Sequence, residues 1–295
     1  MEFLFSVFTP TYNRANTIGR TYEYLCKQTL RSFEWIIVDD GSTDNTEEIV
    51  QKWINTNKIS IVYLKQENGG KHRAFNRAVQ IAKGEIFICL DSDDYYIETA
   101  LEIIYSYHLI HKDNPWIAGF SCNSLDLHGN LIGTSLPVDE LVVSHYNLYN
   151  SLSVKGDKGV IYYTRILKEY PFPEFENEFF VTEALVLNRI SLRYKICCIK
   201  RSLEIKDYQR DGLSSKYRHL CLRNPNGYAL YINERNYFNL SFTNYVINAA
   251  SYVRYSLFAG KSFRNIYKEA INRRWTFIIA CFLGILLYIK DKSRS

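Results

Sequence analysis

The stretch FICLDSDDYY, Phe87–Tyr96, places three carboxylates and a hydroxyl group directly after an apolar run. The apolar part is typical of a strand buried in a parallel sheet. Carboxylates this close together repel one another unless a positive group lies among them. Two hypotheses follow: the cluster is a solvated turn that caps the next helix, or it holds a metal ion.

Apolar runs of this kind alternate with helix-like segments through the N-terminal third of the chain. The runs are Phe3–Phe8, Trp35–Val38, Ile59–Leu64 and Glu85–Leu90. The helix-like segments are Asn16–Thr29, Thr46–Asn55, Lys71–Ala82 and Tyr95–His111. Continuous apolar strands that alternate with helices predict an α/β fold with a doubly wound, mostly parallel sheet.

A polar cluster follows each of the four apolar runs. In chain order the clusters read TPTYNR, DDGSTDNT, NGGKHR and DSDD. In doubly wound sheets, ligands bind outside the carboxyl ends of the strands. The four clusters therefore predict one ligand site at that edge of the sheet.

The last cluster contains a candidate metal motif. Asp91 and Asp93 are two residues apart at the end of a strand, so their side chains lie on the same side of it. Their oxygens suit a hard divalent cation such as Mg²⁺ or Mn²⁺, which would also bridge to a diphosphate. An Asp-x-Asp tripeptide occurs often by chance, and the alternative is that Asp93 or Asp94 caps the helix expected over Tyr95–His111. If Asp91 and Asp93 face the diphosphate, Asp94 is expected to cap that helix.

Two other clusters contribute candidate ligand contacts. Asp40, at the end of the second strand, is placed to accept hydrogen bonds from a base edge or a ribose hydroxyl. Asp44 is explained as a helix-start residue that forms a capping pair with Glu47. After the double glycine, Lys71 opens a basic helix start. It is either an anion site made by backbone amides and basic side chains or an ordinary glycine loop with solvated basic residues, and the motif by itself favours the second interpretation.

Together these stretches, with FVTEALVLNRI and YQRDGLSS further along, resemble the GT-A nucleotide-sugar glycosyltransferases of the inverting family 2. Order and spacing agree from about residue 3 to 215, and the later stretches look most like bacterial members that build surface polysaccharides. The resemblance implies a Rossmann-like GT-A fold. It also implies that a sugar, UDP-linked in the donor, is moved with inversion to a glycan or a lipid-linked acceptor.

Carried over residue by residue, the resemblance implies a nucleotide-binding set and a metal ligand. Base, ribose and phosphate contacts fall on Pro10, Tyr12, Asp40, Asn68, Lys71, Asp91 and Arg210. Asp93 matches the direct ligand of Mn²⁺ or Mg²⁺, with Asp91 nearer the ribose. Arg210 is a candidate clamp for the phosphates. The metal and these basic groups would neutralise the leaving nucleoside diphosphate, so no protein acid is needed.

The catalytic base is the least regular part of the match. Many family members have a Glu-Asp pair followed, six residues after the Asp, by an Arg on the same helix. Here Arg189 lies six residues after Glu183, which puts Glu183 in the Asp position and Thr182 in the Glu position. The resemblance therefore assigns the base to Glu183, with Glu176 and Glu178 as alternatives. A helix-start carboxylate is also favoured by the helix dipole alone.

The second part of the chain is expected to differ in structure. Residues 1–215 are predicted to form the catalytic domain and residues 216–295 a helical C-terminal extension. The apolar run Trp275–Ile289 is flanked by basic residues and is short for a membrane span, which needs about 20 residues. A span, an interfacial helix and a packed terminal helix remain as alternatives.

Composition narrows the class of protein. The chain of 295 residues is 47% hydrophobic and 23% charged, which is typical of a globular protein, and its net charge of +5 is too low to indicate nucleic-acid binding. Its 7 cysteines form no CxxC motif and read as core residues in a reducing compartment. The N-terminus lacks a signal-peptide pattern, so a cytoplasmic location is expected, with peripheral contact at the inner face of the cell membrane.

Two other functions remain open on the sequence. A sugar-phosphate nucleotidyltransferase uses a similar sheet, but its Gly-rich phosphate loop would follow the first strand, where this chain has TPTYNR. A nucleotide- or glycan-binding module without catalysis is the other alternative, because Glu183 departs from the usual pattern of the base.

Overall fold

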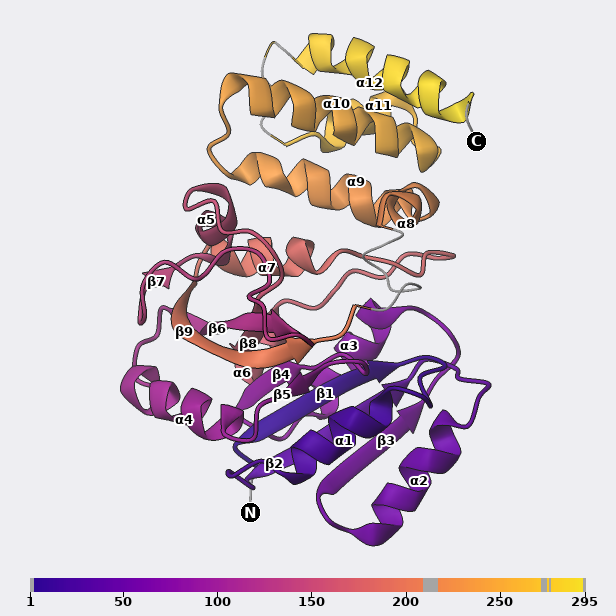
Figure 1. Ribbon diagram of the computed structural model, residues 1–295. Coiled ribbons are helices and arrows are strands. Elements are labelled where there is room, and N and C mark those ends of the chain that lie inside the picture. Colours follow the sequence, from indigo (N-terminus) through magenta and orange to yellow (C-terminus); the bar gives the residue numbers. More distant parts are fainter. Residues whose placement is uncertain (1–2, 209–216, 272–274, 276, 294–295) are drawn as a thin grey trace. The chain divides into compact units, whose positions relative to one another are not determined.

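The structure, a computed structural model, describes residues 3–208, 217–271, 275 and 277–293. The chain divides into two compact units (Figure 1). Residues 1–171 and 187–210 form an α/β unit, and residues 172–186 and 211–295 form a helical unit. Residues 172–186, expected within the N-terminal domain, thus group with the helices of the C-terminal part.

The α/β unit is built on one sheet. Within the described residues its strands pair in the order β3-β2-β1-β4-β8-β6-β9-β5, and β7 pairs with β9. The first four strands along the chain are mutually parallel neighbours: β1 (Phe5–Thr11), β2 (Phe33–Asp39), β3 (Ser60–Lys65) and β4 (Ile86–Cys89). For this part of the chain, the prediction of an α/β fold with a mostly parallel sheet is confirmed.

The rest of the sheet is mixed. Its strands are β5 (Tyr95–Tyr96), β6 (Ile117–Asp126), β7 (Val142–Val143), β8 (Gly159–Tyr163) and β9 (Lys195–Lys206). β8 pairs antiparallel with both β4 and β6, and β6 pairs parallel with β9. The short β5 pairs antiparallel with the end of β9, where Tyr96 is the register partner of Glu204. This pairing brings the acidic cluster of β4 next to the last residues of β9.

Six helices of the described residues belong wholly to the α/β unit. They are α1 (Ile18–Cys26), α2 (Thr46–Thr56), α3 (Lys71–Ile81), α4 (Ala100–His111), α5 (His145–Asn150) and α6 (Thr164–Glu169). Apolar side chains of the central strands, such as Phe5, Ile36 and Ile88, are fully buried. Strands that are buried on both faces explain why their sequences read as unbroken apolar runs.

The prediction of a helix starting at Tyr95 was wrong. Residues 95 and 96 are extended and hydrogen-bonded to β9, and α4 begins at Ala100 with Thr99 as its N-cap. Tyrosine has a high preference for strands, and a partner strand was available. That partner lies more than a hundred residues further along the chain, so local periodicity did not indicate it.

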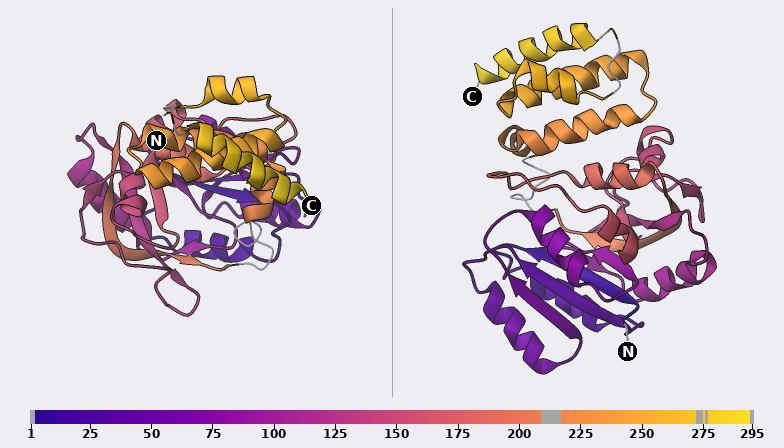
Figure 2. Two further views of the ribbon diagram at one scale, coloured as in Figure 1. Left: turned by 90° about the horizontal axis from the view of Figure 1, so that it is seen from above. Right: turned by 180° about the vertical axis from the view of Figure 1, so that it is seen from behind.

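The helical unit contains α8 (Tyr217–Arg223), α9 (Pro225–Glu234), the 3₁₀ turn η2 (Arg235–Tyr237), α10 (Phe242–Phe258), α11 (Phe263–Glu269) and α12 (Phe277–Lys292). Helix α10 packs against both α9 and α12, and the right-hand view of Figure 2 shows it between them. The core of the unit includes the buried side chains of Ile232, Tyr245, Tyr252 and Val253. Helix α7 (Glu183–Ser191) begins among the residues of the helical unit and ends among those of the α/β unit.

Helix α12 packs closely on α10 through a glycine. A Cβ atom at Gly284 would lie 2.6 Å from the backbone oxygen of Ala250 and 2.7 Å from Cβ of Val253. Phe277 and Ala280 are buried on the same side of the helix, whereas Ile278, Phe282 and Leu286 are exposed. Among the described residues, no helix combines the length and the apolar character that crossing a membrane requires.

Candidate active site

The carboxyl ends of the parallel strands bring the predicted polar clusters to one edge of the sheet. Thr11 at the end of β1 is the register partner of Asp39, which in turn is paired with Lys65. Pro10 lies in β1, and Tyr12 follows that strand with an exposed side chain. The ends of β1, β2, β3 and β4 therefore form the edge at which the sequence predicts a ligand.

Asp40 and Asn68 lie together at this edge. The buried carboxylate of Asp40 accepts hydrogen bonds from the backbone N–H groups of Gly69 (2.8 Å) and Gly70 (2.7 Å) and from Nε2 of Gln66 (2.7 Å). Nδ2 of Asn68 donates to the backbone oxygen of Asp40 at 2.9 Å. A carboxylate has about four lone-pair sites, so Asp40 holds the glycine loop and keeps capacity for a further donor. Its contact with a base or ribose stays a prediction.

The turn after β2 is fixed by Asp44. Its carboxylate accepts hydrogen bonds from the backbone N–H of Thr46 (3.0 Å) and from the backbone N–H of Ala15 (3.0 Å). Although burial opposes the shift, a hydrogen bond from the Thr46 hydroxyl and these two backbone bonds lower the pKa of Asp44. The predicted structural role of Asp44 is confirmed, but its predicted partner is wrong: Glu47 forms an ion pair with Lys65 at 2.7 Å.

Lys71 and Asp91 form an ion pair across the site. Lys71 is the first residue of α3, and its Nζ lies 2.6 Å from Oδ1 of Asp91. Gly70, just before it, has a φ of 93°, a conformation that suits glycine and turns the chain into the helix. Although burial opposes it, the ammonium groups of Lys71 and Lys206 lower the pKa of Asp91. Asp91 is therefore an ionised carboxylate held next to a cation.

Asp93 lies in the same tight turn as Asp91. The backbone N–H of Asp94 donates to the backbone oxygen of Asp91 (3.0 Å), and Nη2 of Arg20 donates to the backbone oxygen of Asp93 (2.7 Å). Burial and the neighbouring carboxylate of Asp91 raise the pKa of Asp93. A carboxylate under these conditions gains from a nearby positive charge.

The carboxylate oxygens at the turn suit a cation that is also coordinated by a bound ligand. Within the described residues, no three His, Cys, Asp or Glu side chains are arranged to hold a metal ion. Mg²⁺ and similar ions in nucleotide sites commonly take only one or two carboxylates and complete their shell with phosphate oxygens and water. Asp93, with Asp91 beside it, fits that mode of binding; the assignment of the metal to Asp93 stays a prediction.

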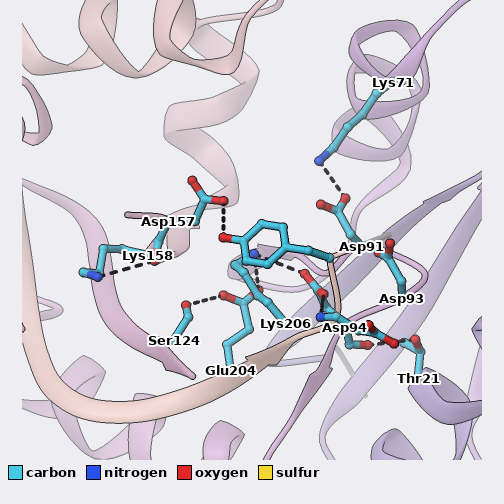
Figure 3. Close-up of polar contacts among 12 residues, drawn as sticks. Thr21, Lys71, Asp91, Asp93, Asp94, Ser124, Asp157, Lys158, Glu204 and Lys206 are labelled. Atoms are coloured by element: carbon cyan, nitrogen blue, oxygen red, sulfur yellow. Dashed lines mark hydrogen bonds and ion pairs between the residues drawn. The ribbon is translucent and has the colours of Figure 1, made fainter. Parts of the chain in front are cut away.

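Asp94 does not cap a helix, contrary to the expectation. Its carboxylate accepts hydrogen bonds from Nζ of Lys206 (3.1 Å) and from the backbone N–H of Asp207 (2.9 Å), and Figure 3 shows Lys206 between Asp94 and Glu204. Lys206 was not among the site residues expected from the sequence. Its side chain reaches the acidic turn only because β5 pairs with β9, and no local pattern signals that pairing.

The candidate bases belong to the helical unit. Glu183 is the first residue of α7, and Arg189 lies in the last turn of the same helix. Glu178 is buried, and its carboxylate accepts hydrogen bonds from the backbone N–H groups of Asn226 (2.7 Å) and Gly227 (2.9 Å) at the start of α9. Glu178 thus anchors a helix, which leaves Glu183 and the exposed Glu176 as better candidates. Arg210, the predicted phosphate clamp, lies outside the described residues.

Comparison with known proteins connects the N-terminal part of the chain with a family of glycosyltransferases. Residues 6–125 match the family described as glycosyl transferase family 2. Glycosyltransferase GlyG of Streptococcus pneumoniae is 35% identical over 149 residues, which cover 48% of this chain and 48% of that protein. Poly(ribitol-phosphate) β-N-acetylglucosaminyltransferase TarS of Staphylococcus aureus is 32% identical over 200 residues, 64% of this chain and 34% of that protein. The chain thus matches about half or less of the length of these relatives.

Solved structures show the same fold. The structure of S. aureus TarS 1–349 in complex with UDP-GlcNAc has a TM-score of 0.65 and 20% identity, and the match covers 100% of this chain and 92% of that one. Mannosyltransferase PcManGT of Pyrobaculum calidifontis, solved with GDP-Man and Mn²⁺, has a TM-score of 0.57 and 15% identity, covering 99% and 88%. The sequence match thus assigns residues 6–125 to glycosyltransferase family 2, and the structural match gives the chain the GT-A fold.

Proposed function

We propose that this protein is an inverting glycosyltransferase that moves a sugar from a nucleotide-sugar donor to a glycan or a lipid-linked acceptor in the synthesis of a bacterial surface polysaccharide. The observation that carries the proposal is the acidic turn after β4. There Asp91 is paired with Lys71 and lies next to Asp93, inside a domain that matches family 2. A donor with a diphosphate suits this mixture of cationic and metal-binding groups.

We propose a uridine nucleotide in the donor. One observation supports it: TarS, to which this chain is similar, was solved with UDP-GlcNAc. In this chain, Pro10, Tyr12 and Asp40 would hold the base and ribose. Asp40 is already fixed by the backbone of the glycine loop, so it would meet the nucleotide without having to reorganise.

The residues of the chain account for the binding and positioning of the diphosphate. The ammonium of Lys71 at the N-terminus of α3 would attract the phosphates, helped by the positive end of the helix. Arg210 would contribute a second cation from its segment. Mn²⁺ or Mg²⁺, when bound at Asp93, supplies the charge that neutralises the leaving nucleoside diphosphate.

Glu183 is the proposed catalytic base. Its carboxylate would take the proton from an acceptor hydroxyl as the oxygen attacks the anomeric carbon. One displacement breaks the bond to the diphosphate and forms the new glycosidic bond, so the anomeric configuration inverts. The register of Glu183 with Arg189 on α7, and the engagement of Glu178 at the start of α9, support this choice.

A lipid-linked acceptor would suit the outer face of α12. This face is lined by exposed apolar side chains, among them Ile278, Phe282 and Leu286. The helix has a single acidic residue, Asp291, which is turned inward and ion-paired with Arg254. Lys290 and Lys292 are exposed at its end. An apolar face with only basic charges suits an anionic lipid surface, so we place the enzyme at the cytoplasmic face of the membrane.

Binding of UDP by the full chain tests the donor and metal sites. We expect UDP to raise the melting temperature in Mn²⁺ or Mg²⁺ more than in EDTA, and Asp93→Asn to remove the difference. Asp113→Asn, which changes an exposed aspartate outside the site, serves as the matched control. Equal stabilisation in EDTA would contradict the metal assignment. A screen of nucleotide sugars by hydrolysis then identifies the donor.

Transfer activity tests the base. Glu183→Gln is expected to keep UDP binding and to lose transfer by a factor of about 10² to 10⁴, the usual contribution of general base catalysis. Glu169→Gln, at an exposed carboxylate at the end of α6, is the control, and Glu176→Gln tests the alternative base. Full transfer activity in Glu183→Gln would show that another group takes the proton.

A further inference from the structure

Three consecutive residues at the end of β9 connect this strand to three other parts of the α/β unit. Nζ of Lys206 lies 3.1 Å from the carboxylate of Asp94, and the backbone N–H of Asp207 also donates to that carboxylate, at 2.9 Å. The carboxylate of Asp207 is ion-paired with Arg20 at 2.6 Å. The hydroxyl of Tyr208 donates to Asp157 at 2.8 Å. The end of β9 is thus fixed to the acidic turn, to α1 and to the loop before β8.

Lys206 is the buried cation of this group. Its side chain is 14% exposed, and those of its carboxylate partners are 7% exposed for Asp94 and 3% for Glu204, with 3.2 Å between Lys206 and Glu204. Although burial alone would lower the pKa of Lys206, Glu204, Asp94 and Asp91 raise it well above its usual range. Two buried carboxylates would be costly without such a cation, because a buried charge must be paired.

The carboxylate of Asp94 holds the turn from one side, and its backbone holds it from the other. The hydroxyl of Thr21 donates to the backbone oxygen of Asp94 at 2.8 Å, and Arg20 donates to the backbone oxygen of Asp93 at 2.7 Å. Both donors belong to α1, whereas Lys206 belongs to β9. The turn that presents Asp91 and Asp93 is therefore fixed between a helix and a strand, as Figure 3 shows for Thr21, Asp94 and Lys206.

From this geometry we propose that Lys206 is a positioning residue for the donor site. It acts through Asp94: the ammonium neutralises that carboxylate and thereby fixes the orientation in which Asp91 and Asp93 meet the diphosphate and its cation. Residues that orient metal-binding carboxylates from behind contribute strongly to affinity, and their loss typically costs about 10- to 100-fold. The effect of Lys206 on donor binding rests on the proposed function, whereas its effect on the structure of the turn does not.

Three variants separate this role from general stability. Lys206→Met removes the cation and leaves two buried carboxylates opposed. Glu204→Gln is the matched control, because it removes a charge from the same cluster but keeps the contact between Lys206 and Asp94. The double variant Lys206→Met/Asp94→Asn removes both charges of the pair, and the new amide oxygen can still accept from the N–H of Asp207. It also keeps the test valid if Lys206→Met alone does not fold.

Amide hydrogen exchange, measured without any ligand, tests whether Lys206 holds the turn in place. In Lys206→Met, amides of residues 90–96 are expected to exchange about tenfold faster, because the turn opens locally, while those of β1 and β2 stay unchanged. Glu204→Gln should leave the turn as in the wild type, and the double variant should restore it. Unchanged exchange in Lys206→Met, or equal acceleration in Glu204→Gln, would overturn the role of Lys206.

Binding of UDP with Mn²⁺, measured by calorimetry, tests the consequence for the donor. We expect about 10- to 100-fold weaker binding in Lys206→Met, wild-type affinity in Glu204→Gln, and recovery in the double variant. Wild-type affinity in Lys206→Met would overturn the positioning role. If the wild-type protein itself does not bind UDP with Mn²⁺, the proposed function is wrong, and hydrogen exchange still decides separately whether Lys206 fixes the turn.

Discussion

The Nζ atom of Lys71 lies 2.6 Å from the carboxylate of Asp91, and this ion pair joins the start of α3 to the turn after β4. Both residues were assigned to the nucleotide from sequence, but as separate motifs. Their contact shows that the cationic and acidic parts of the predicted donor site meet directly. An incoming diphosphate would therefore exchange one anionic partner of Lys71 for another.

Replacement of Lys71 is expected to weaken donor binding. In Lys71→Gln the diphosphate loses a cation at the helix start, and UDP should bind about tenfold more weakly, which corresponds to about 1.4 kcal/mol. Lys58→Gln, which changes an exposed lysine in the loop before β3, is the control. Titration calorimetry with UDP measures both. Unchanged affinity in Lys71→Gln would show that the phosphates lie elsewhere.

Replacement of Glu178 is expected to destabilise the helical unit. Its carboxylate binds two backbone N–H groups at the start of α9, and loss of a partner in hydrogen bonds of this kind costs about 1–3 kcal/mol. Glu178→Ala should lower the free energy of unfolding by about 2 kcal/mol and leave UDP affinity unchanged. Chemical denaturation with Glu176→Ala as control measures the effect. Normal stability with complete loss of transfer would instead mark Glu178 as a base.

Two glycines in helices are expected to respond in opposite ways to alanine. Gly19 is exposed in α1, and a Cβ atom there would meet no neighbour within 4 Å, so Gly19→Ala should stabilise the protein by about 0.5–1 kcal/mol through helix preference. At Gly284, the same change places a methyl group 2.6 Å from the backbone oxygen of Ala250. Gly284→Ala should therefore destabilise the packing of α12 on α10, by about 1–3 kcal/mol. Thermal unfolding of both variants decides, and stabilisation by Gly284→Ala would contradict the close packing.

The stability of the protein is expected to depend on His145 below neutral pH. Burial lowers the pKa of His145 to about 4, and in an unfolded chain the pKa of histidine is near 6.5. The unfolded chain therefore binds a proton that the folded protein excludes, and stability falls as the pH drops from about 6.5 towards 4. At pH 5.5 this costs about 1.4 kcal/mol.

The variant His145→Phe isolates this effect. It keeps an aromatic ring near Tyr149, whose ring lies 4.9 Å away, and removes the titrating group. Between pH 7.5 and 5.5 the wild-type protein should lose about 1.4 kcal/mol more unfolding free energy than the variant. His128→Phe, at an exposed turn, is the control and should behave as the wild type. Parallel pH curves for His145→Phe and the wild type would contradict the prediction.

The outer face of α12 is expected to bind anionic lipid vesicles. The full chain should co-sediment with phosphatidylglycerol vesicles and less with phosphatidylcholine, because an apolar face with basic charges favours an anionic surface. The variant Phe282→Ser/Leu286→Ser should lose this binding, whereas Leu109→Ser/Ile110→Ser, which changes two exposed apolar residues on α4, should keep it. Retained binding in the α12 variant would contradict the assignment, and self-association that the variant abolishes would indicate a second copy as the partner.

The sequence alone determined the α/β order and the edge of the sheet at which the polar clusters gather. Strands such as β1 and β2 are buried on both faces, so their apolar runs are visible without any knowledge of their neighbours, and the residues that follow them must lie at the same edge. Asp40, Lys71, Asp91 and Asp93 were found in this way. The carboxylates of DSDD could thus be placed together, but their individual partners could not.

Tertiary structure decided which of the candidate carboxylates are held by contacts within the fold. Asp94 was expected to cap a helix, and it is held by Lys206 because β5 pairs with β9. Glu178 was a candidate base, and it anchors α9 from a distant part of the sequence. Both contacts join residues far apart in the chain, and only the packed fold brings such charges within hydrogen-bonding distance. Local patterns indicate where carboxylates gather, whereas the pairing of strands and helices determines what each one contacts.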